Sequence, residues 1–320
     1  MRDILISENI RGAAVDTLSQ RFDVVSMPEL WKDPAALEAQ IPNYRALIVR
    51  NQTRVTSSLL SAATNLKVIG RAGVGLDNVD VDYATKAGIL ITYTPDQNAI
   101  SVAEIAIGQM LSLARFIPNA NEDTKTGHWN RQLYMGIELY GKTLGIVGAG
   151  KIGYLTAKRA QAFGMKILAY DPFLSQDNVY ISELNADLVE LDVLLARADF
   201  VSCHLPATPQ TIGLFGATRF QKMKPTAFFI NTARGEVMCE ADLVAALKSK
   251  QIAGAALDVR SKEPPELGEL EQLPNVVLTP HIAAFTREAQ QRVTKAICED
   301  VARVLEGKPA QNLVHGHMLR

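Results

Sequence analysis

Four side chains in the second half of the chain suit proton transfer and the binding of a carboxylate. Arg234, Asp258 and His281 each follow a short apolar run of the kind that forms a buried strand. Glu263 lies in the segment after Asp258, directly before two prolines. The carboxyl ends of parallel strands form one edge of a sheet, where ligands bind, so we expect these side chains to face one crevice.

The stretch from Leu144 to Gly153, LGIVGAGKIG, has the features of a dinucleotide-binding turn. An apolar run enters a G-x-G-x-x-G sequence, a helical pattern leaves it, and a second apolar run ends on Asp171. Gly148 permits a tight turn, Gly150 lets a pyrophosphate approach the backbone, and Gly153 lets the helix pack close to the strand. The phosphates would bind at the positive N-terminal end of that helix.

Asp171 favours NAD over NADP as the cofactor. Its carboxylate can accept hydrogen bonds from both ribose hydroxyls of NAD and would repel a 2′-phosphate. The next residues, Pro172-Phe173-Leu174, supply no cation that could bind such a phosphate.

Beside a nicotinamide, the strand-end side chains suit hydride transfer between a hydroxyl and a keto carbon. His281, as imidazolium, can give a proton to the developing alkoxide and take it back in the reverse reaction. Glu263 would favour the imidazolium and orient the ring. Arg234 can bind a substrate carboxylate through two hydrogen bonds and polarise the adjacent carbonyl. Singly, His281 could cap a strand and Arg234 could pair with a surface acid, so the hypothesis depends on their occurring together.

Length, composition and charge limit the class of protein. The chain has 320 residues, which suits two domains, and 48% hydrophobic residues can fill sizeable cores. A net charge of −1 gives no reason to expect nucleic acid or a membrane surface as partner. The three cysteines have no metal-like spacing, and we expect free thiols in a reducing compartment. We find no signal peptide and no apolar run of about 18 residues, and therefore expect a cytoplasmic protein.

His315 and His317 near the end of the chain raise the question of a metal site. Two histidines alone fix no metal geometry, so we expect a solvated tail and no metal.

The apolar patterns predict strands that alternate with helices, which is typical of parallel sheets covered by helices on both faces. Predicted strands lie at 4–6, 22–26, 46–49, 67–70, 89–92, 144–147, 166–170, 200–205, 227–231, 253–259 and 276–279. Predicted helices lie at 13–21, 34–41, 57–63, 98–115, 154–163 and 286–305. Ser101 and Glu104 have the spacing of a capping box at the start of the 98–115 helix.

A homodimer is expected around this helix and the polar arm that follows it to Arg131. The helix is apolar around more of its circumference than a surface helix needs. The arm and its continuation carry Trp129 and Tyr134, which are good interface anchors.

The chain resembles the D-isomer-specific 2-hydroxyacid dehydrogenase family, and most of all its 3-phosphoglycerate dehydrogenase-like branch. The similar motifs cover nearly the whole chain: GRAGVGLDNVD at 70–80, GHWNR at 127–131, GKTLGI at 141–146, HLP at 204–206 with Thr211, NTARG at 231–235 and TPHI at 279–282. The resemblance implies a Rossmann NAD-binding domain, residues 98–286, inserted in a flavodoxin-like substrate domain, residues 1–97 and 287–320. Both domains would be doubly wound parallel α/β sheets.

The resemblance also implies residue roles. Arg234, Glu263 and His281 would be the catalytic set. The positions implied for contact with NAD are Gly148, Gly150, Lys151, Ile152, Gly153, Asp171, Leu205, Pro206, Thr211, Thr232, Ala233, Arg234, Asp258, His281, Ala283 and Ala284. The positions implied for substrate binding are Arg50, Val74, Gly75, Asn98, Arg234 and His281.

The chain departs from the family pattern in ways that leave the substrate open. Ala283-Ala284-Phe285 replaces a commoner glycine-containing run, and Gln52 and Arg54 follow Arg50. Phosphoglycerate, hydroxypyruvate, glyoxylate, and sulfonated or sugar-derived hydroxy acids are all candidates. The chain stops soon after His281, so we expect no C-terminal regulatory domain. A dinucleotide-sensing, corepressor-like binding protein and a hydrolase that uses bound NAD are the alternatives from other classes.

Overall fold

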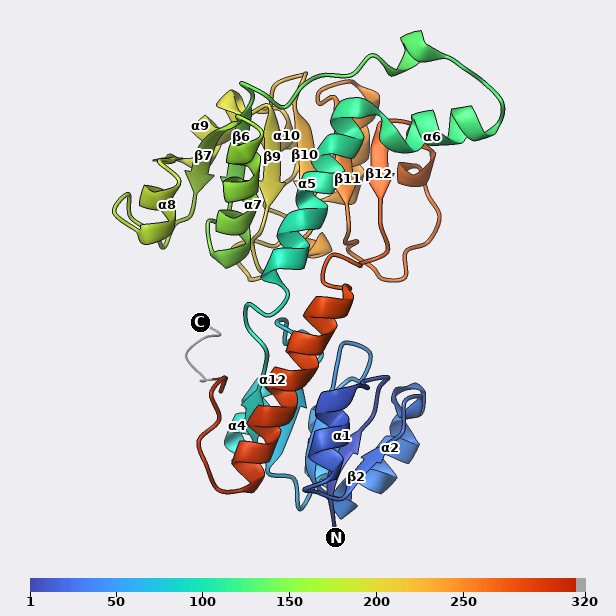
Figure 1. Cartoon of the computed structure of the whole chain (residues 1–320), viewed down its shortest axis with the longest axis vertical. Helices are drawn as coiled ribbons and strands as arrows, with labels where there is room; N and C mark the ends of the chain where they lie inside the picture. The colour runs from blue at the N-terminus through green and yellow to red at the C-terminus, as the bar shows by residue number, and fades with distance from the viewer. Residues whose placement is uncertain (315–320) are drawn as a thin grey trace. The chain divides into compact units, whose positions relative to one another are not determined.

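The chain forms two compact units, each a parallel β-sheet covered by helices (Figure 1). The computed structural model describes residues 1–314, so His315 and His317 lie outside the described residues. Unit 1 comprises Met1–Asn98 together with Thr286–Arg320, and unit 2 comprises Ala99–Phe285. The predicted fold class, α/β with two parallel sheets, is confirmed.

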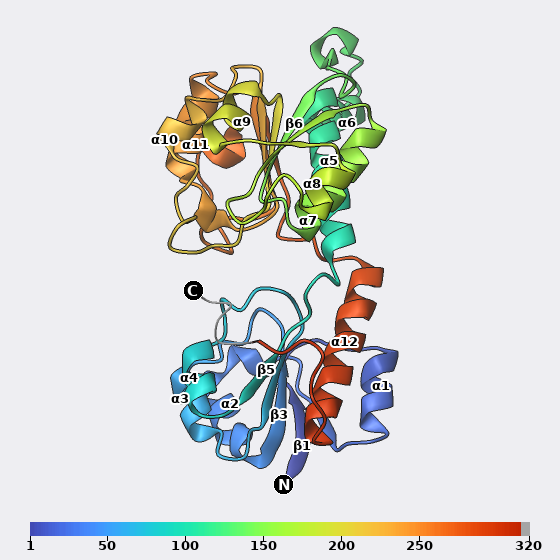
Figure 2. The same cartoon turned by 90° about the vertical axis from the view of Figure 1, so that its left-hand side faces the viewer.

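Unit 1 contains a five-stranded parallel sheet in the order β2-β1-β3-β4-β5, the flavodoxin-like order. Its strands are β1 (Arg2–Ile6), β2 (Val24–Ser26), β3 (Tyr44–Val49), β4 (Val68–Arg71) and β5 (Leu90–Thr92). Helices α1 (Ala13–Ser19) and α12 (Arg287–Leu305) cover one face, and α2 (Pro34–Gln40), α3 (Ser57–Ala62) and α4 (Val81–Lys86) cover the other (Figure 2).

Strand β1 shows why both faces of this sheet need helices. Ile4 and Ile6 pack in the cluster that includes α1 and α12, whereas Leu5 packs in the cluster with α2, α3 and α4. All three side chains are fully buried, as expected for a strand between two helical layers. Thr286 caps α12 by accepting a hydrogen bond from the nitrogen of Ala289, 3.1 Å away.

Unit 2 contains a seven-stranded parallel sheet in the order β12-β11-β10-β9-β6-β7-β8. Its strands are β6 (Thr143–Val147), β7 (Lys166–Tyr170), β8 (Asp187–Leu188), β9 (Phe200–Cys203), β10 (Phe228–Asn231), β11 (Gly254–Leu257) and β12 (Val276–Leu278). The strand order reverses between β6 and β9, and the carboxyl end of such a switch point is where ligands bind in this kind of sheet.

Helices also cover both faces of the second sheet (Figure 2). One face carries α5 (Ala99–Arg115), α7 (Lys151–Ala162) and α8 (Val179–Glu183), and the other carries α9 (Leu191–Arg197), α10 (Ala217–Phe220) and α11 (Glu240–Lys248). Five short 3-10 helices complete the described structure: η1 (Leu30–Lys32), η2 (Ile41–Asn43), η3 (Arg131–Tyr134), η4 (Gly235–Val237) and η5 (Leu270–Gln272).

The start of α5 differs from the predicted capping box. The helix begins at Ala99, and Ser101 is a buried residue of its first turn rather than the cap. Ser101 and Glu104 therefore both lie inside the helix, and Ser101 is buried there instead of capping the helix N-terminus.

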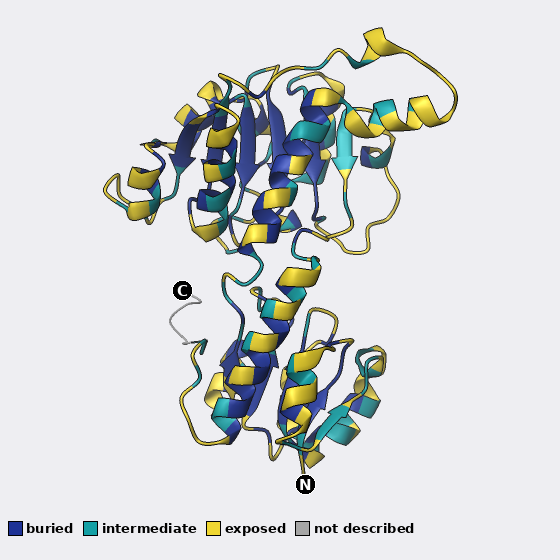
Figure 3. Cartoon of the chain, in the orientation of Figure 1, coloured by how far each residue is buried: buried dark blue, intermediate teal, exposed yellow. Residues whose placement is uncertain are grey.

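The segment after α5 is the most exposed part of unit 2 (Figure 3). Helix α6 (Ile117–Lys125) has no buried residue, and the chain beyond it as far as Ile137 has none either. Among residues 1–314, no single helix is long and apolar enough to cross a membrane. Only the pair α5 and α6, with a 63° bend between them, meets the length and composition requirement together.

Candidate functional site

The ends of five neighbouring strands in unit 2 lie in one row. The ladder pairs Val147 with Cys203, Cys203 with Asn231, Asn231 with Leu257, and Leu257 with Leu278. The next residues of each strand carry the predicted site: the glycine turn after β6, Leu205 and Pro206 after β9, Thr232 to Arg234 after β10, Asp258 after β11 and His281 after β12. The structure thus brings the predicted residues of this unit to one edge of one sheet.

The three glycines of the turn have three different environments. Gly148 has a φ of +91°, which favours glycine, and an added Cβ would lie 3.0 Å from the carbonyl of His204. A Cβ on Gly153 would lie 2.2 Å from the oxygen of Gly148, so α7 packs against the turn only without one. A Cβ on Gly150 would meet nothing within 4 Å. Gly150 therefore faces open space at the helix N-terminus, as a phosphate-binding position requires.

Asp171, at the end of β7, is held against this glycine turn. Its Oδ2 accepts a hydrogen bond from the nitrogen of Ala149 at 3.0 Å, and its Oδ1 accepts one from the nitrogen of Phe173 at 3.0 Å. Each carboxylate oxygen has two lone pairs, so both can still accept a ribose hydroxyl. The carboxylate is thereby oriented before any cofactor binds.

Other predicted cofactor residues surround the same edge. The hydroxyl of Thr232 is buried and has no hydrogen-bond partner among the described residues, as expected of a group that forms a hydrogen bond with a bound ligand. The Nζ of Lys151 lies 5.7 Å from the ring centre of Tyr180, which is stacked on Tyr154 at the side of α7. The hydroxyl of Thr211 donates to the oxygen of Pro206 at 2.5 Å and so fixes that loop.

His281 and Glu263 form a direct pair. The Nδ1 of His281 lies 2.6 Å from Oε2 of Glu263, and 44% of the histidine side chain is exposed. The other glutamate oxygen accepts a hydrogen bond from the nitrogen of Arg260 at 3.0 Å. Because Nδ1 is used by Glu263, Nε2 is the ring nitrogen that can exchange a proton with a ligand.

The pKa values of the pair shift in opposite directions. The hydrogen bond to Glu263 is the main reason that the pKa of His281 is raised; burial opposes it, and the charges of Glu263 and Asp258 support it. Burial acts to raise the pKa of Glu263, but the hydrogen bonds from His281 and from the Arg260 backbone outweigh it and the pKa is lowered. Imidazolium beside carboxylate is therefore the favoured state.

Asp258 holds the backbone that presents His281. The residue is 1% exposed, and its carboxylate accepts hydrogen bonds from the Thr279 hydroxyl at 2.5 Å and the nitrogens of Ile282 at 2.9 Å and Ala283 at 2.7 Å. His281 has a φ of +53°, a strained value for a histidine, and these bonds stabilise that turn. The cofactor contact implied for Asp258 stays a prediction, and the described contacts show that its carboxylate holds the turn of His281.

Arg234 lies beside the pair, and its charge acts on both partners. It lowers the pKa of His281 and that of Glu263, each as the weakest of several causes. Its Nη1 donates to the carbonyl of Ala233 at 2.8 Å. A fixed positive charge next to an imidazolium suits the binding of an anionic substrate group.

The predicted substrate residues of unit 1 lie after its own strands. Arg50 follows β3, and its loop is held by the buried Glu8, which accepts hydrogen bonds from the nitrogens of Arg50 at 2.7 Å and Thr53 at 2.9 Å. Burial lowers the pKa of the Arg50 guanidinium, and the charge of Glu8 partly offsets this. Val74 and Gly75 follow β4 in a partly exposed loop.

Asn98 is the last residue of the first segment of unit 1. Its side-chain oxygen is buried without a hydrogen-bond partner among the described residues. Like the hydroxyl of Thr232, this oxygen is available to a ligand.

Comparison with known proteins identifies the family. Residues 107–283 match the model of the "D-isomer specific 2-hydroxyacid dehydrogenase, NAD binding domain". The chain belongs to the D-isomer-specific 2-hydroxyacid dehydrogenase family. The matched segment contains the glycine turn and His281 and ends at Ala283, and NAD is the cofactor of this domain.

Relatives of the family resemble the chain over nearly its full length. D-3-phosphoglycerate dehydrogenase of Archaeoglobus fulgidus is 44% identical over 98% of this chain and 59% of that protein. A solved structure of a protein from Thermus thermophilus has a TM-score of 0.91 and 34% identity, covering 98% of this chain and 100% of the other. A glyoxylate reductase from Paecilomyes thermophila has a TM-score of 0.88 and 30% identity, with 99% of each chain covered.

The chain spans about 59% of the length of the first of these dehydrogenase relatives. The matches support an enzyme of this family and do not favour the corepressor-like alternative.

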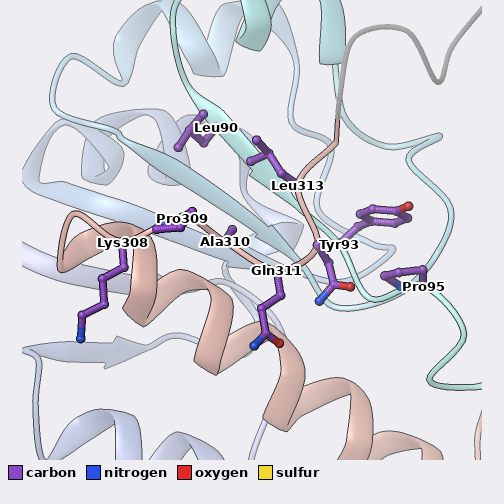
Figure 4. A pocket seen from close by; sticks show the side chains of 9 residues that line it. Leu90, Tyr93, Pro95, Lys308, Pro309, Ala310, Gln311 and Leu313 are labelled. Atoms are coloured by element: carbon purple, nitrogen blue, oxygen red, sulfur yellow. The ribbon is translucent and has the colours of Figure 1, made fainter.

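Unit 1 also has a cavity of about 390 Å³ between β5 and the segment 308–313 (Figure 4). Its lining residues include Leu90, Tyr93 and Leu313, and none of the predicted dehydrogenase residues lies in it. Among residues 1–314, no group of three or more His, Cys, Asp or Glu side chains is arranged to hold a metal ion.

Three residues near His281 and Glu263 were missed by the sequence analysis. Arg260, Glu240 and Glu271 form an ion cluster behind the loop of Glu263. The only signal in the sequence that could have indicated this ion cluster is Arg260 itself, which directly follows Asp258 and Val259.

Proposed function

We propose that the chain is an NAD-dependent D-2-hydroxyacid dehydrogenase, which interconverts a D-2-hydroxy acid and its 2-keto acid. The observation that carries the proposal is the 2.6 Å contact between His281 and Glu263 at the same sheet edge as the glycine turn. A histidine with a raised pKa at that edge is a general acid for a developing alkoxide. Arg234 beside it suits the carboxylate of the acid.

The proposed mechanism assigns a task to each side chain. NAD, when bound, supplies the acceptor or donor of a hydride. Arg234 binds and orients the substrate carboxylate, which aligns the 2-position beside the ring of His281. In reduction, Nε2 of His281 gives its proton to the substrate oxygen, and in oxidation it takes the proton back. Glu263 stabilises the imidazolium, and Asp258 holds the strained turn.

The residues of the glycine turn fit NAD. The open position at Gly150, the N-terminus of α7 without a side-chain cap, and the oriented carboxylate of Asp171 suit the pyrophosphate and the ribose. We propose that the nicotinamide half binds in the segments that follow β10 and β12, which contain Thr232, Ala233, Ala283 and Ala284.

We propose that unit 1 is the substrate domain and unit 2 the cofactor domain. Arg50, Val74, Gly75 and Asn98 would contact the substrate from unit 1. The substrate class is that of phosphoglycerate, hydroxypyruvate or glyoxylate. D-3-phosphoglycerate dehydrogenases among the relatives support the first of these, and the glyoxylate reductase supports the last.

The test is the loss of NADH absorbance with a panel of 2-keto acids that includes 3-phosphohydroxypyruvate, hydroxypyruvate and glyoxylate. We expect NADH oxidation with at least one of them, and formation of NADH from the matching D-hydroxy acid but not from its L-isomer. No turnover with any member in either direction would contradict the proposal.

The first prediction is that NADH is preferred over NADPH because of Asp171. Loss of the ribose hydrogen bonds and repulsion of a 2′-phosphate should cost NADPH about 10–100-fold in kcat/KM. In Asp171→Asn this preference should shrink, while Asp177→Asn, an exposed acid in the next loop, should keep it. Steady-state kinetics with both cofactors measure it, and equal values for wild-type protein would refute it.

The second prediction is a homodimer formed through the exposed arm. Trp129 is 78% exposed and Met135 77% exposed, which is unusual for large apolar side chains on one segment. The apolar residues of α5 from Ile107 to Ala114 pack in the core of unit 2, so the argument for the dimer uses the arm. Sedimentation should give a dimer for wild type and for Val179→Glu, and a monomer for Trp129→Glu/Met135→Glu. A monomeric wild type would rule the dimer out.

We also propose a cytoplasmic location. Cys203, Cys239 and Cys298 are all free thiols, and two of them are buried, which suits a reducing compartment.

A further inference from the structure

The loop that carries Glu263 begins near Arg260, and the side chain of Arg260 anchors it to other elements of unit 2. Nη2 of Arg260 lies 2.8 Å from Glu240 and Nη1 lies 2.5 Å from Glu271. Glu240 is the first residue of α11 and Glu271 belongs to η5, so one guanidinium joins two elements of unit 2. The Arg260 side chain is only 12% exposed.

A second set of bonds fixes the backbone next to Arg260. Oε1 of Glu240 accepts hydrogen bonds from the nitrogen of Ser261 at 2.8 Å and from its hydroxyl at 2.9 Å. Oε2 of Glu271 accepts one from the nitrogen of Gly268 at 2.8 Å. The two glutamates therefore hold the loop on both sides of Glu263.

The same loop touches the turn that carries Arg234. A Cβ on Gly235 would lie 2.0 Å from the carbonyl carbon of Arg260 and 2.3 Å from the nitrogen of Ser261. The backbone after Arg234 can approach this closely only because residue 235 is glycine. The backbone of Arg260 therefore contacts both the turn that carries Arg234 and the carboxylate of Glu263.

The link from Arg260 to the reacting histidine is short. The Arg260 nitrogen donates to Oε1 of Glu263, and Oε2 of the same carboxylate pairs with Nδ1 of His281. The bond to Oε1 orients the carboxylate of Glu263, and Oε2 of that carboxylate contacts the imidazole of His281. A loop free to shift would weaken the contact, because a charge-assisted hydrogen bond depends on its geometry.

We propose that Arg260, clamped between Glu240 and Glu271, is a positioning residue that holds Glu263 in contact with His281. The role of the pair in turnover rests on the proposed function, but the contact itself does not. Arginine suits this place because its planar fork can serve two carboxylates at once, which the single ammonium of a lysine does less well.

If Arg260 no longer holds Glu263 in place, the pKa of His281 should fall. Three charged groups act on its ring: Glu263 and Asp258 raise its pKa, and Arg234 lowers it. A weaker contact with Glu263 removes the main cause of the raised pKa. Imidazolium is the form that reduces the keto acid, so a lower pKa should move the alkaline decline of reduction to lower pH.

The test compares Arg260→Lys with Arg45→Lys. Arg45 makes a similar half-buried contact with Asp3 at 2.8 Å in unit 1 and a bond to the oxygen of Leu305, so it controls for lost stability. The chain has five histidines, and the NMR signal of His281 is assigned as the one lost in His281→Asn. We expect the His281 pKa to fall in Arg260→Lys, in the direction of Glu263→Gln, and to stay at the wild-type value in Arg45→Lys.

Kinetics give the second measurement. With NADH and hydroxypyruvate, or the member of the panel that is turned over, kcat/KM at alkaline pH should fall about tenfold in Arg260→Lys, because a lower pKa of His281 leaves less imidazolium at that pH. At acid pH it should change little.

Each outcome decides the proposal. A His281 pKa that is unchanged in Arg260→Lys overturns it, as does an equal shift in Arg45→Lys. If Arg260→Lys does not fold, Glu271→Gln removes one anchor and leaves the arginine, and a wild-type His281 pKa in that variant has the same meaning. If wild type turns over no keto acid but the pKa shifts as expected, the proposed function fails and the positioning role stands.

Discussion

His281→Ala should lower kcat by about 10²–10⁴-fold, the usual contribution of general acid catalysis, while the affinity for NADH stays near that of wild type. His281 gives the proton to the substrate oxygen, so its loss falls on the chemical step. The phosphates are expected at Gly148 to Gly153, which follow β6, whereas His281 follows β12. Steady-state kinetics and NADH fluorescence titration separate the two effects.

A second variant of His281 is needed because its backbone conformation strains most side chains. Its φ of +53° suits asparagine better than alanine, so His281→Asn removes the ring without adding strain. His128→Ala, an exposed histidine on the arm, is the matched control and should keep full turnover. Comparable kcat in wild type and His281→Asn would exclude His281 as the acid.

A double-mutant comparison tests the partner. If Glu263 acts through the histidine, Glu263→Gln should lower turnover in wild type and add little in His281→Ala. An equal loss in both backgrounds would show that Glu263 acts independently of His281.

The parts of this structure that were predictable depend on short-range patterns. Buried parallel strands are continuous apolar runs, and Ala46 to Val49 or Phe228 to Ile230 could hardly be anything else. Each run ends where polar residues begin, and the register aligns those ends in one row, so Arg234, Asp258 and His281 could be expected at one edge.

The parts that were not predictable depend on contacts between distant residues. Strand β8 has two residues, too few for any periodicity. Asp258 looks in sequence like any acid at a strand end, and only the turn at 279–283 reveals that its carboxylate accepts hydrogen bonds from that turn. The clamp on Arg260 joins residues 240, 260 and 271, which no local pattern connects.

The glycine turn allows a second prediction of large effect, because its three glycines separate folding from cofactor binding. Gly153→Ala should destabilise the fold, since the new Cβ would lie 2.2 Å from the oxygen of Gly148. Gly150 has a φ of −67°, which any residue adopts, and its Cβ would meet nothing within 4 Å. Gly150→Val should therefore fold as wild type does.

The two methyl groups of Gly150→Val would instead occupy the space in front of the N-terminus of α7. A pyrophosphate kept from these backbone nitrogens loses charge-assisted hydrogen bonds of about 1.5–3 kcal/mol each, so NADH affinity should fall roughly 100-fold or more. Gly108→Ala, at another position where a Cβ meets nothing, should leave the affinity unchanged and should not lower stability, because alanine suits the interior of α5 better than glycine does. Thermal unfolding without cofactor and NADH titration test this together. If Gly150→Val binds NADH as tightly as wild type, the phosphates do not lie at this turn. If it unfolds at lower temperature than wild type, the open space serves the fold and not the cofactor.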